Sequence, residues 1–357
     1  MRVKLEEVCK RIYAGGDVPK DRYSEVKTEE YSVPIYANAE KDGGLYGYTD
    51  KAREEELSIT IAARGTIGFT AIRREPFLPV VRLITVVPDT DKVSERYLYY
   101  VLCNCKTQSS GTSIPQLTVP DIKKNSLELY SIAEQEYIAD QLDKVNRIIE
   151  LRQKELDVLD NLIKARFVEM FGDENNSKNW DVVNVEEVAD VQVGVVIKPS
   201  QYYTDKSEGV RTFRSLNIGA GFIKDIDWVY FTKEGHQKNS KSILKKDDLL
   251  IVRSGAPGTA CVVTEDYAGC NAVDIIIAHP DCKKVNPYYL CTFTNMPHGK
   301  KQIDEGIGGA AQQHFNVGKY NKLQLMLPPK TLQDEFVGFV KQVNKSKVVV
   351  SNTLYYN

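Results

Sequence analysis

Residues 138–170 read IADQLDKVNRIIELRQKELDVLDNLIKARFVEM, and this stretch decides the architecture of the chain. Its apolar residues recur at alternating steps of four and three, which is the spacing of a heptad seam on a helix. The seam positions are 138, 142, 145, 149, 152, 156, 159, 163, 166 and 170, of which only Arg152 and Arg166 are not apolar. Gly172 follows as a stop signal. The pattern predicts one helix over Ile132–Phe171, about 60 Å long at about 1.5 Å per residue.

A second stretch near the end of the sequence repeats this spacing over a shorter length. Its seam consists of Phe336, Val340, Val343, Lys347, Val350 and Leu354. Because an amphipathic helix must bury its apolar stripe, we expect the two helices to pack against each other, antiparallel, with a module at either end. The alternative is a coiled coil that joins two copies of the chain.

The segments before the two helices also resemble each other. Residues 3–8 (VKLEEV) return as residues 183–188 (VNVEEV), and residues 61–68 (IAARGTIG) return as residues 251–258 (IVRSGAPG). Further matches follow in the same order: Tyr97-Leu98 with Tyr289-Leu290, 111–119 with 309–317, 127–129 with 325–327, and Gln135, Val145 and Asn146 with Gln333, Val343 and Asn344. Several matches in register predict an internal duplication. Each copy mixes short β-branched strands with Gly, Pro, Asn and Asp turns before its helix.

Composition and charge restrict the possible functions. Hydrophobic residues make up 42% and charged residues 27% of the 357 residues, the balance of a globular protein of two ordinary domains. A net charge of −2 argues against a protein that coats DNA without sequence preference, because such proteins depend on a strong positive field. A local run of lysines, which we interpret mainly as a solvated face, comprises Lys233, Lys238, Lys241, Lys245 and Lys246.

No targeting or membrane signal is present in the sequence. The first twenty residues include several charged ones, among them Arg2, Lys4 and Glu6, and lack the apolar run of a signal peptide. No run in the sequence reaches the roughly 18 apolar residues of a membrane span. The odd number of seven cysteines indicates reduced thiols rather than disulfides. We therefore expect a cytoplasmic protein.

Three motifs suggest chemistry that we do not expect the chain to perform. Residues 286–289 (NPYY) resemble the base-holding motif of amino-methyltransferases but lack its second proline, and no glycine-rich loop after a strand offers a cofactor site. Residues 306–309 (GIGG) lack the Lys-Ser or Lys-Thr of a phosphate loop. The cysteines and histidines lack the Cys-x-x-Cys pairs of a zinc site. We expect no catalytic residue, no metal and no cofactor on this chain.

Taken with the duplication, several stretches resemble the specificity subunit of type I restriction-modification systems, and the resemblance covers essentially the whole chain. The stretches are 35–38 (IYAN), 47–50 (GYTD), 59–68 (ITIAARGTIG), 194–199 (GVVIKP) and 164–172 (KARFVEMFG) with Trp180 after its polar linker. The resemblance implies an α/β (α+β) fold in which two repeated target-recognition domains are joined by two long antiparallel coiled-coil helices with pseudo-two-fold symmetry. The implied division is domain 1 over 1–131, the central helix over 132–172, domain 2 with its linker over 173–330 and a distal helix over 331–357, short for the family.

The same resemblance implies the function and the partners. Each target-recognition domain is expected to read one half of a bipartite, asymmetric sequence in double-stranded DNA. Two methyltransferase subunits would bind the helices and supply S-adenosylmethionine and adenine N6 methylation, and restriction subunits would supply ATP-driven translocation and cleavage.

Polar residues on loops are the candidates for contacts with the DNA, because a scaffold can present them to base edges. In the first half the candidates are Tyr36, Asn38, Lys41, Arg64, Thr66, Ser113 and Gln116. In the second half they are Arg214, Asn217, Arg253, Ser254, Gln312, Gln313 and His314. For each one, the competing interpretation is a solvated or locally hydrogen-bonded turn residue. Two other functions stay open: a coiled-coil interaction protein, and a self-contained methyltransferase.

Overall fold

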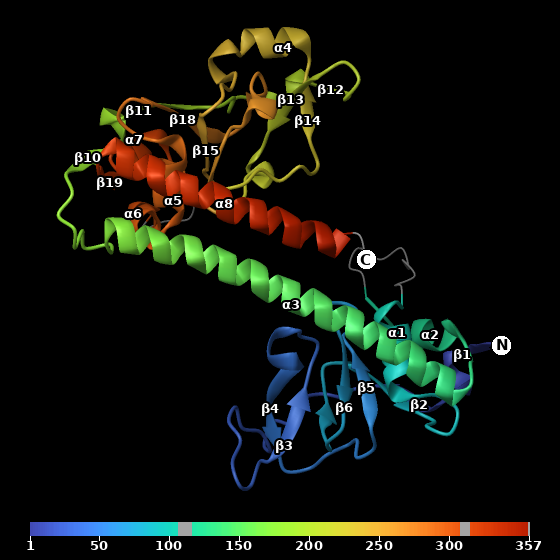
Figure 1. Ribbon diagram of the computed structural model, residues 1–357. Helices are drawn as coiled ribbons and strands as arrows, with labels where there is room; N and C mark the ends of the chain where they lie inside the picture. The colour runs from blue at the N-terminus through green and yellow to red at the C-terminus, as the bar shows by residue number, and fades with distance from the viewer. Residues whose placement is uncertain (106–115, 308–314, 356–357) are drawn as a thin grey trace. The chain divides into compact units, whose positions relative to one another are not determined.

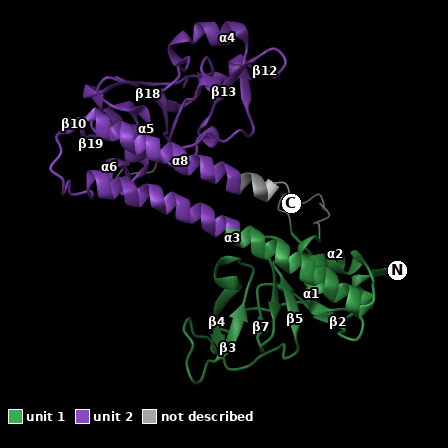
Figure 2. Cartoon of the chain, viewed as in Figure 1, with its two compact units in different colours: residues 1–151 green, residues 152–357 purple. Residues whose placement is uncertain are grey.

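A computed structural model describes residues 1–105, 116–307 and 315–355, with side chains through residue 350 (Figure 1). The chain forms two compact units, Met1–Leu151 and Arg152–Asn357 (Figure 2). The long helix α3, Ile132–Phe171, belongs to both units and has the bounds predicted from its heptad pattern. Each unit is described below by itself.

In its described residues, unit 1 contains three small sheets, two α-helices of its own and the first part of α3. A four-stranded sheet has the order β2-β8-β5-β6, a three-stranded sheet has the order β4-β3-β7, and β1 pairs with β9. The strands are β1 (Arg2–Lys4), β2 (Cys9–Ala14), β3 (Val33–Tyr36), β4 (Leu45–Thr49), β5 (Ser58–Ile61), β6 (Thr70–Arg73), β7 (Leu78–Pro79), β8 (Ile84–Pro88) and β9 (Ser126–Glu128). Helices α1 (Glu95–Cys103) and α2 (Val119–Lys124) precede β9 and α3.

Unit 2 repeats this plan with additions. Its sheets are β11-β18-β15-β16, β12-β14-β13-β17 and β10-β19. The strands are β10 (Val182–Asn184), β11 (Ala189–Val193), β12 (Tyr203–Thr204), β13 (Val210–Phe213), β14 (Val229–Phe231), β15 (Leu249–Val252), β16 (Ala260–Val262), β17 (Asn271–Ala272), β18 (Ile275–Pro280) and β19 (Gln324–Met326). The helices are α4 (Lys233–Lys238), α5 (Pro287–Asn295), α6 (Pro297–Ile307), α7 (Val317–Asn321) and α8 (Lys330–Tyr355).

The two units confirm the internal duplication. In both, the first strand pairs with the last, so that Val3 faces Leu127 and Val183 faces Leu325, and all four residues lie in segments that match in the sequence. A parallel pair also recurs inside each second sheet, β3 with β7 and β13 with β17. The two units therefore share these strand pairs.

Buried polar contacts repeat as faithfully as the strands. The side-chain oxygen of Gln135 accepts from the backbone of Ser94 at 2.9 Å, and that of Gln333 accepts from Asn286 at 2.8 Å. Both glutamines are completely buried at the start of a long helix. A buried amide without partners would cost stability, so this pair of bonds fixes how each helix joins its unit.

The central strand β15 of unit 2 is covered by a core on each of its two faces. All four residues of β15 are buried. Leu249 and Ile251 face a core formed with α5 and the long helices, while Leu250 and Val252 face a second core beneath Phe213 and Ala272. Because neighbouring side chains of a strand point to opposite faces, a continuous apolar run suits a strand covered on both sides.

Helices α3 and α8 pair within unit 2, where they run side by side (Figure 1). The rings of Phe167 and Phe336 lie 5.5 Å apart, and Lys347 donates to Asp160 at 2.6 Å. From the first contact to the second, the residue number falls along α3 and rises along α8. The two helices are therefore antiparallel, as predicted.

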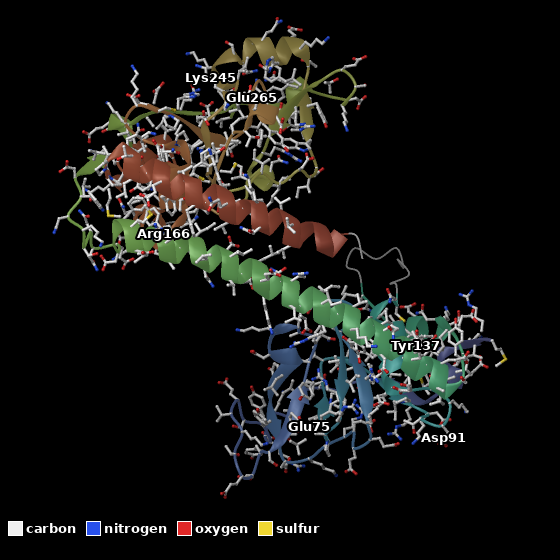
Figure 3. The ribbon with its side chains drawn as sticks, viewed as in Figure 1. Glu75, Asp91, Tyr137, Arg166, Lys245 and Glu265 are labelled. Atoms are coloured by element: carbon white, nitrogen blue, oxygen red, sulfur yellow. The ribbon has the colours of Figure 1, made fainter. Side chains whose placement is uncertain are left out.

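The heptad seam explains which side of α3 is covered. Between residues 151 and 166 the partly shielded residues are the seam residues Arg152, Leu156, Leu159, Ile163 and Arg166, and the others are exposed. Figure 3 labels Arg166 on α3. Its guanidinium, a polar exception in the seam, binds Glu335 of α8 at 3.3 Å. Polar residues at seam positions favour one alignment of two helices over its alternatives.

Within the described ranges, no helix is both long enough and apolar enough to cross a membrane.

Candidate nucleic-acid interface

The hairpins β5–β6 and β15–β16 end in the same turn. The amide of Gly68 donates to the carbonyl of Ala62 at 2.9 Å, and that of Gly258 donates to Val252 at the same distance. Both glycines have positive φ, 89° and 74°, a conformation that side chains with a Cβ rarely adopt. The aligned sequences IAARGTIG and IVRSGAPG thus place corresponding residues at two equivalent tips.

At the first tip, the structure brings two predicted residues together. Arg64 donates from Nε and Nη2 to the side-chain oxygen of Gln116, at 3.0 and 2.8 Å. The amide of Leu117 bonds the carbonyl of Ala63 at 3.0 Å, which holds Gln116 beside the tip. Arg64 is exposed, and its Nη1 has no hydrogen-bond partner among the described residues. The exposed Thr66 lies on the same turn.

Asn38 supports this tip from the neighbouring loop. Its side-chain oxygen accepts from the amide of Ala63 at 2.8 Å, and its nitrogen donates to the carbonyl of Val81. Both ends of the amide therefore bind backbone. The structure gives Asn38 a supporting position next to Arg64.

Sequence reasoning missed Arg82, which follows Val81 at the edge of this surface. Both residues have positive φ, 52° and 60°, and both are exposed. A valine in this conformation is strained, and strained backbone is often found at functional sites. No hydrogen bond or ion pair in the described parts of the chain uses the Arg82 guanidinium. Nothing in the sequence around residue 82 signals this turn.

Tyr36 ends β3 and Lys41 lies on the turn that follows, and the two differ in accessibility. The guanidinium of Arg73 lies 3.6 Å from the centre of the Tyr36 ring, and burial raises the pKa of the Tyr36 hydroxyl. Arg73 also donates to the carbonyl of Gly43 at 2.6 Å. Lys41 is exposed on the short turn that Arg73 holds. Of the two candidates, Lys41 is the one whose charge reaches solvent.

In unit 2 the predicted arginines are already paired, Arg253 at the second tip and Arg214 at the end of β13. Arg253 binds the carboxylate of Asp274 and the carbonyl of Phe315, and its side chain is only 17% exposed. Arg214 binds Asp227 at 3.0 Å. Ser254 follows Arg253 on the turn and is partly exposed. The equivalent surfaces of the two units thus carry different charges.

Asn217 is completely buried. Its oxygen accepts from the amide of Arg214 at 2.9 Å, and its nitrogen donates to the carbonyl of Ile226 at 2.6 Å. Since no part of this amide can meet a base edge, we withdraw Asn217 from the DNA-contacting candidates and assign it to the interior of its loop. The candidates Ser113, Gln312, Gln313 and His314 lie outside the described residues.

The lysine run agrees with a solvated face. Lys233 and Lys238 lie on α4, and the Lys246 ammonium binds Glu265 at 3.1 Å. Figure 3 labels Lys245 and Glu265 on unit 2. Exposed pairs of this kind contribute little to stability.

The motif NPYY at residues 286–289 is the beginning of α5. Asn286 caps the helix by accepting from the amide of Tyr288 at 3.0 Å, and it also bonds Asp334. The buried Tyr289 hydroxyl donates to the carbonyl of Met326 at 2.7 Å. The equivalent Tyr97 donates to Glu128 in unit 1. The motif therefore serves the fold of unit 2, and its last tyrosine has the same role as Tyr97 in unit 1.

The cysteines and acidic side chains form no metal centre in the parts of the chain that the structure describes. All seven cysteines are free, and Cys261, Cys270 and Cys291 are buried. Burial raises the pKa of Cys291 to about 12 and that of Cys270 to about 11. Thiols held in the protonated form are poor metal ligands and poor nucleophiles.

Comparison with known proteins gives one consistent result. The family model of the type I restriction modification DNA specificity domain matches residues 1–161 and 177–354. A putative type I specificity subunit of Mycoplasma pneumoniae is 35% identical, over 45% of this chain and 50% of that protein. A type I restriction enzyme specificity subunit of Methanocaldococcus jannaschii is 22% identical, over 95% of this chain and 84% of that protein.

The crystal structure of a type I restriction-modification S subunit from M. genitalium matches with a TM-score of 0.54 and 15% identity, over 100% of this chain and 92% of that one. This likeness supports the duplicated fold. The chain spans about half the length of the M. pneumoniae relative in its alignment. Because the family model covers nearly all of the sequence, the chain belongs to the type I restriction-modification DNA specificity family.

Proposed function

We propose that this chain is the non-catalytic specificity subunit of a type I restriction-modification system and reads a bipartite, asymmetric DNA sequence. The observation that carries the proposal is a single scaffold present twice with different side chains at its two equivalent hairpin tips. Arg64 and Gln116 occupy the first surface, and Arg253, paired with Asp274, occupies the second. Since base edges in the major groove are distinguished by donors and acceptors, two unlike tips would read two unlike half-sites.

The proposed contacts follow from accessibility. In unit 1, Arg64 has free donors for guanine, Gln116 has an amide nitrogen for a base acceptor, and Lys41 and Arg82 have charges for phosphates. Asn38 and Tyr36 would position these residues. In unit 2, Ser254 and the loops that begin at Arg214 and Arg253 would contact the DNA.

The partner subunits would bind the exposed apolar side of α3. Its exposed residues include Ile148 (47%), Leu151 (48%), Val158 (64%) and Leu162 (45%). A row of such side chains on one helix favours an interaction with another protein. We propose that methyltransferase subunits cover it and carry S-adenosylmethionine, and that restriction subunits supply ATP-driven cleavage.

We expect the purified chain to transfer no methyl group alone and to direct adenine N6 methylation to one bipartite sequence when its methyltransferase subunits are added. The measurement is sequencing of methylated adenine in a duplex library after incubation with S-adenosylmethionine. Methylation by the lone chain at the rate of the mixture would support a self-contained enzyme. Methylation by the mixture without sequence preference would support a coiled-coil interaction protein.

We expect Arg64→Ala to weaken recognition of only one half-site, by about 1–3 kcal/mol for one lost bidentate base contact. Because Gln116 orients Arg64, Gln116→Ala should affect the same half-site, and the double variant should lose less than the sum of the two. Binding to duplexes mutated in either half measures this. Arg74→Ala is the matched control, since Arg74 follows the other end of the same hairpin and pairs with Glu95. Equal losses for Arg64→Ala and Arg74→Ala would contradict the assignment.

A further inference from the structure

The loop between β13 and β14 presents an aromatic side chain to solvent. Phe222 is 54% exposed and Ile226, on the same loop, is 55% exposed. The corresponding connection of unit 1, residues 37–44, reads ANAEKDGG and carries no large apolar side chain. A single exposed apolar residue is ordinary on a protein surface. The contacts that hold Phe222 and its loop therefore decide whether its exposure indicates a binding role.

The tip that carries Phe222 is held by hydrogen bonds on each side. The amide of Gly219 donates to the carbonyl of Phe222 at 2.8 Å, and Ile218 pairs with Ile223 as an isolated bridge. The amide of Gly221 donates to the carbonyl of Ala260 at 2.8 Å, which attaches the tip to β16.

The base of the loop is held from within by the buried Asn217. Its side chain bonds Arg214 and Ile226, and its carbonyl accepts from the amide of Lys224 at 2.8 Å. The loop is therefore ordered before any partner arrives, and binding through it would lose little conformational entropy.

The Phe222 ring lies directly over Gly219. A Cβ placed on Gly219 would come within 2.6 Å of the ring, and no such atom exists in glycine. Around Gly221, which has a φ of 84°, a Cβ would meet nothing within 4 Å. The ring thus rests on backbone while more than half of its side chain remains accessible.

The surroundings of the ring fit DNA. Ala260, which anchors the tip, directly follows the β15–β16 turn that carries Arg253 and Ser254. Lys224 is exposed and forms no ion pair among the described residues. Of the two carboxylates nearby, Asp227 is paired with Arg214, and Asp225 accepts from the Trp228 indole, which fixes its position but leaves its charge. A lysine without an ion pair, next to a phenyl ring on a hydrogen-bonded loop, suits a phosphate beside a base.

We propose that Phe222 inserts as an apolar wedge at one base step of the half-site read by unit 2. This inference rests on the proposed function and assigns one of its specificity-determining residues. Apolar side chains that enter a base step unstack it and bend the duplex. Pyrimidine–purine steps unstack most easily, so the wedge selects TA or CA/TG at that position through deformability rather than through hydrogen bonds.

The test compares the full chain, bound to its methyltransferase subunits, with three variants on a duplex library. Phe222→Ala is expected to bind the preferred sequence about tenfold more weakly, as for loss of one aromatic–base contact, and to lose the preference at one dinucleotide in the unit 2 half-site. Gly219→Ala keeps the ring but displaces it, so it should show the same loss. Val182→Ala, which shortens an exposed apolar side chain on β10, should behave as the wild type.

Three results would overturn the inference. Unchanged base selection by Phe222→Ala and Gly219→Ala would contradict the role of Phe222 as a wedge but would not affect the proposed function. Weaker binding of the methyltransferase subunits with unchanged base selection would assign the ring to a protein contact. A wild-type complex without sequence preference would instead contradict the proposed function, and therefore also the role of Phe222.

Discussion

Phe167→Ala is expected to lower the free energy of unfolding of unit 2 by about 3–5 kcal/mol, the range for removing a fully buried phenylalanine ring. Phe167 has no exposed surface, and its ring contacts five others. These are Phe171, Tyr289, Phe293, His298 and Phe336, with ring centres between 4.9 and 6.4 Å from that of Phe167. They come from α3, α5, α6 and α8, so truncation opens a cavity where four helices meet.

The tryptophans make this loss measurable in unit 2 alone. The chain has two, Trp180 and Trp228, and both belong to unit 2. The Trp180 indole donates to the carbonyl of Phe171 at 3.0 Å, next to the aromatic cluster. Urea unfolding followed by tryptophan fluorescence therefore reports on unit 2. Val168→Ala is the control, since Val168 is 41% exposed on the next position of the helix and should change stability by less than about 0.5 kcal/mol. Equal midpoints for the two variants would show that the cluster does not hold unit 2 together.

The sequence alone predicted the parts of the fold that depend on periodicity and repetition. The bounds of α3 and the covered side of its seam follow from a heptad pattern, because burial on a helix repeats with its turn. The equivalence of the two hairpin tips follows from matching glycines that need positive φ. In each case a local pattern carries the information, and no distant contact has to be known.

Contacts between distant residues could not be predicted in the same way. Asn217 has the residue type and loop position of a base-reading residue, yet its loop folds back and buries it. From the sequence, Arg253 is a candidate for a free guanidinium, but in the structure it is paired with Asp274. Conversely, Phe222 has an unremarkable residue type, and only its exposure on a hydrogen-bonded loop draws attention to it. Burial and pairing depend on tertiary structure, which a single sequence does not reveal.

The repeated and the divergent contacts have different roles. Gln135 and Gln333 make the same buried bonds in both units, which preserves the way a helix joins its unit. The exposed contacts beside them differ, since Arg96 binds three acidic residues of α3, whereas its counterpart Tyr288 lies 5.5 Å from the Lys341 ammonium of α8. Exposed contacts can therefore differ between the units while the repeated buried bonds keep the same frame.

The second large effect is a change in the distance between half-sites, which we expect when helices α3 and α8 are lengthened. We expect a seven-residue insertion after Leu156 in α3, matched by one after Lys347 in α8, to lengthen the preferred spacer by about three base pairs. Seven residues keep each seam on the same face and add about 10 Å at roughly 1.5 Å per residue. That length corresponds to about three steps of about 3.4 Å along one DNA strand. Placing the second insertion after Lys347 keeps the bond between Lys347 and Asp160 intact.

The half-site sequences should remain unchanged under this insertion, because neither hairpin tip nor the Phe222 loop is altered. Three base pairs also turn one half-site by about a third of a helical turn, so some affinity should be lost. Selection from a library with fixed half-sites and variable spacers measures the shift, and circular dichroism checks that the added turns are helical. A heptad in α3 alone is the control, since it leaves the added seam without a facing helix and should broaden the spacer preference. An unchanged preferred spacer in the well-folded double insertion would show that α3, although continuous from one unit into the other, does not set the distance between the half-sites.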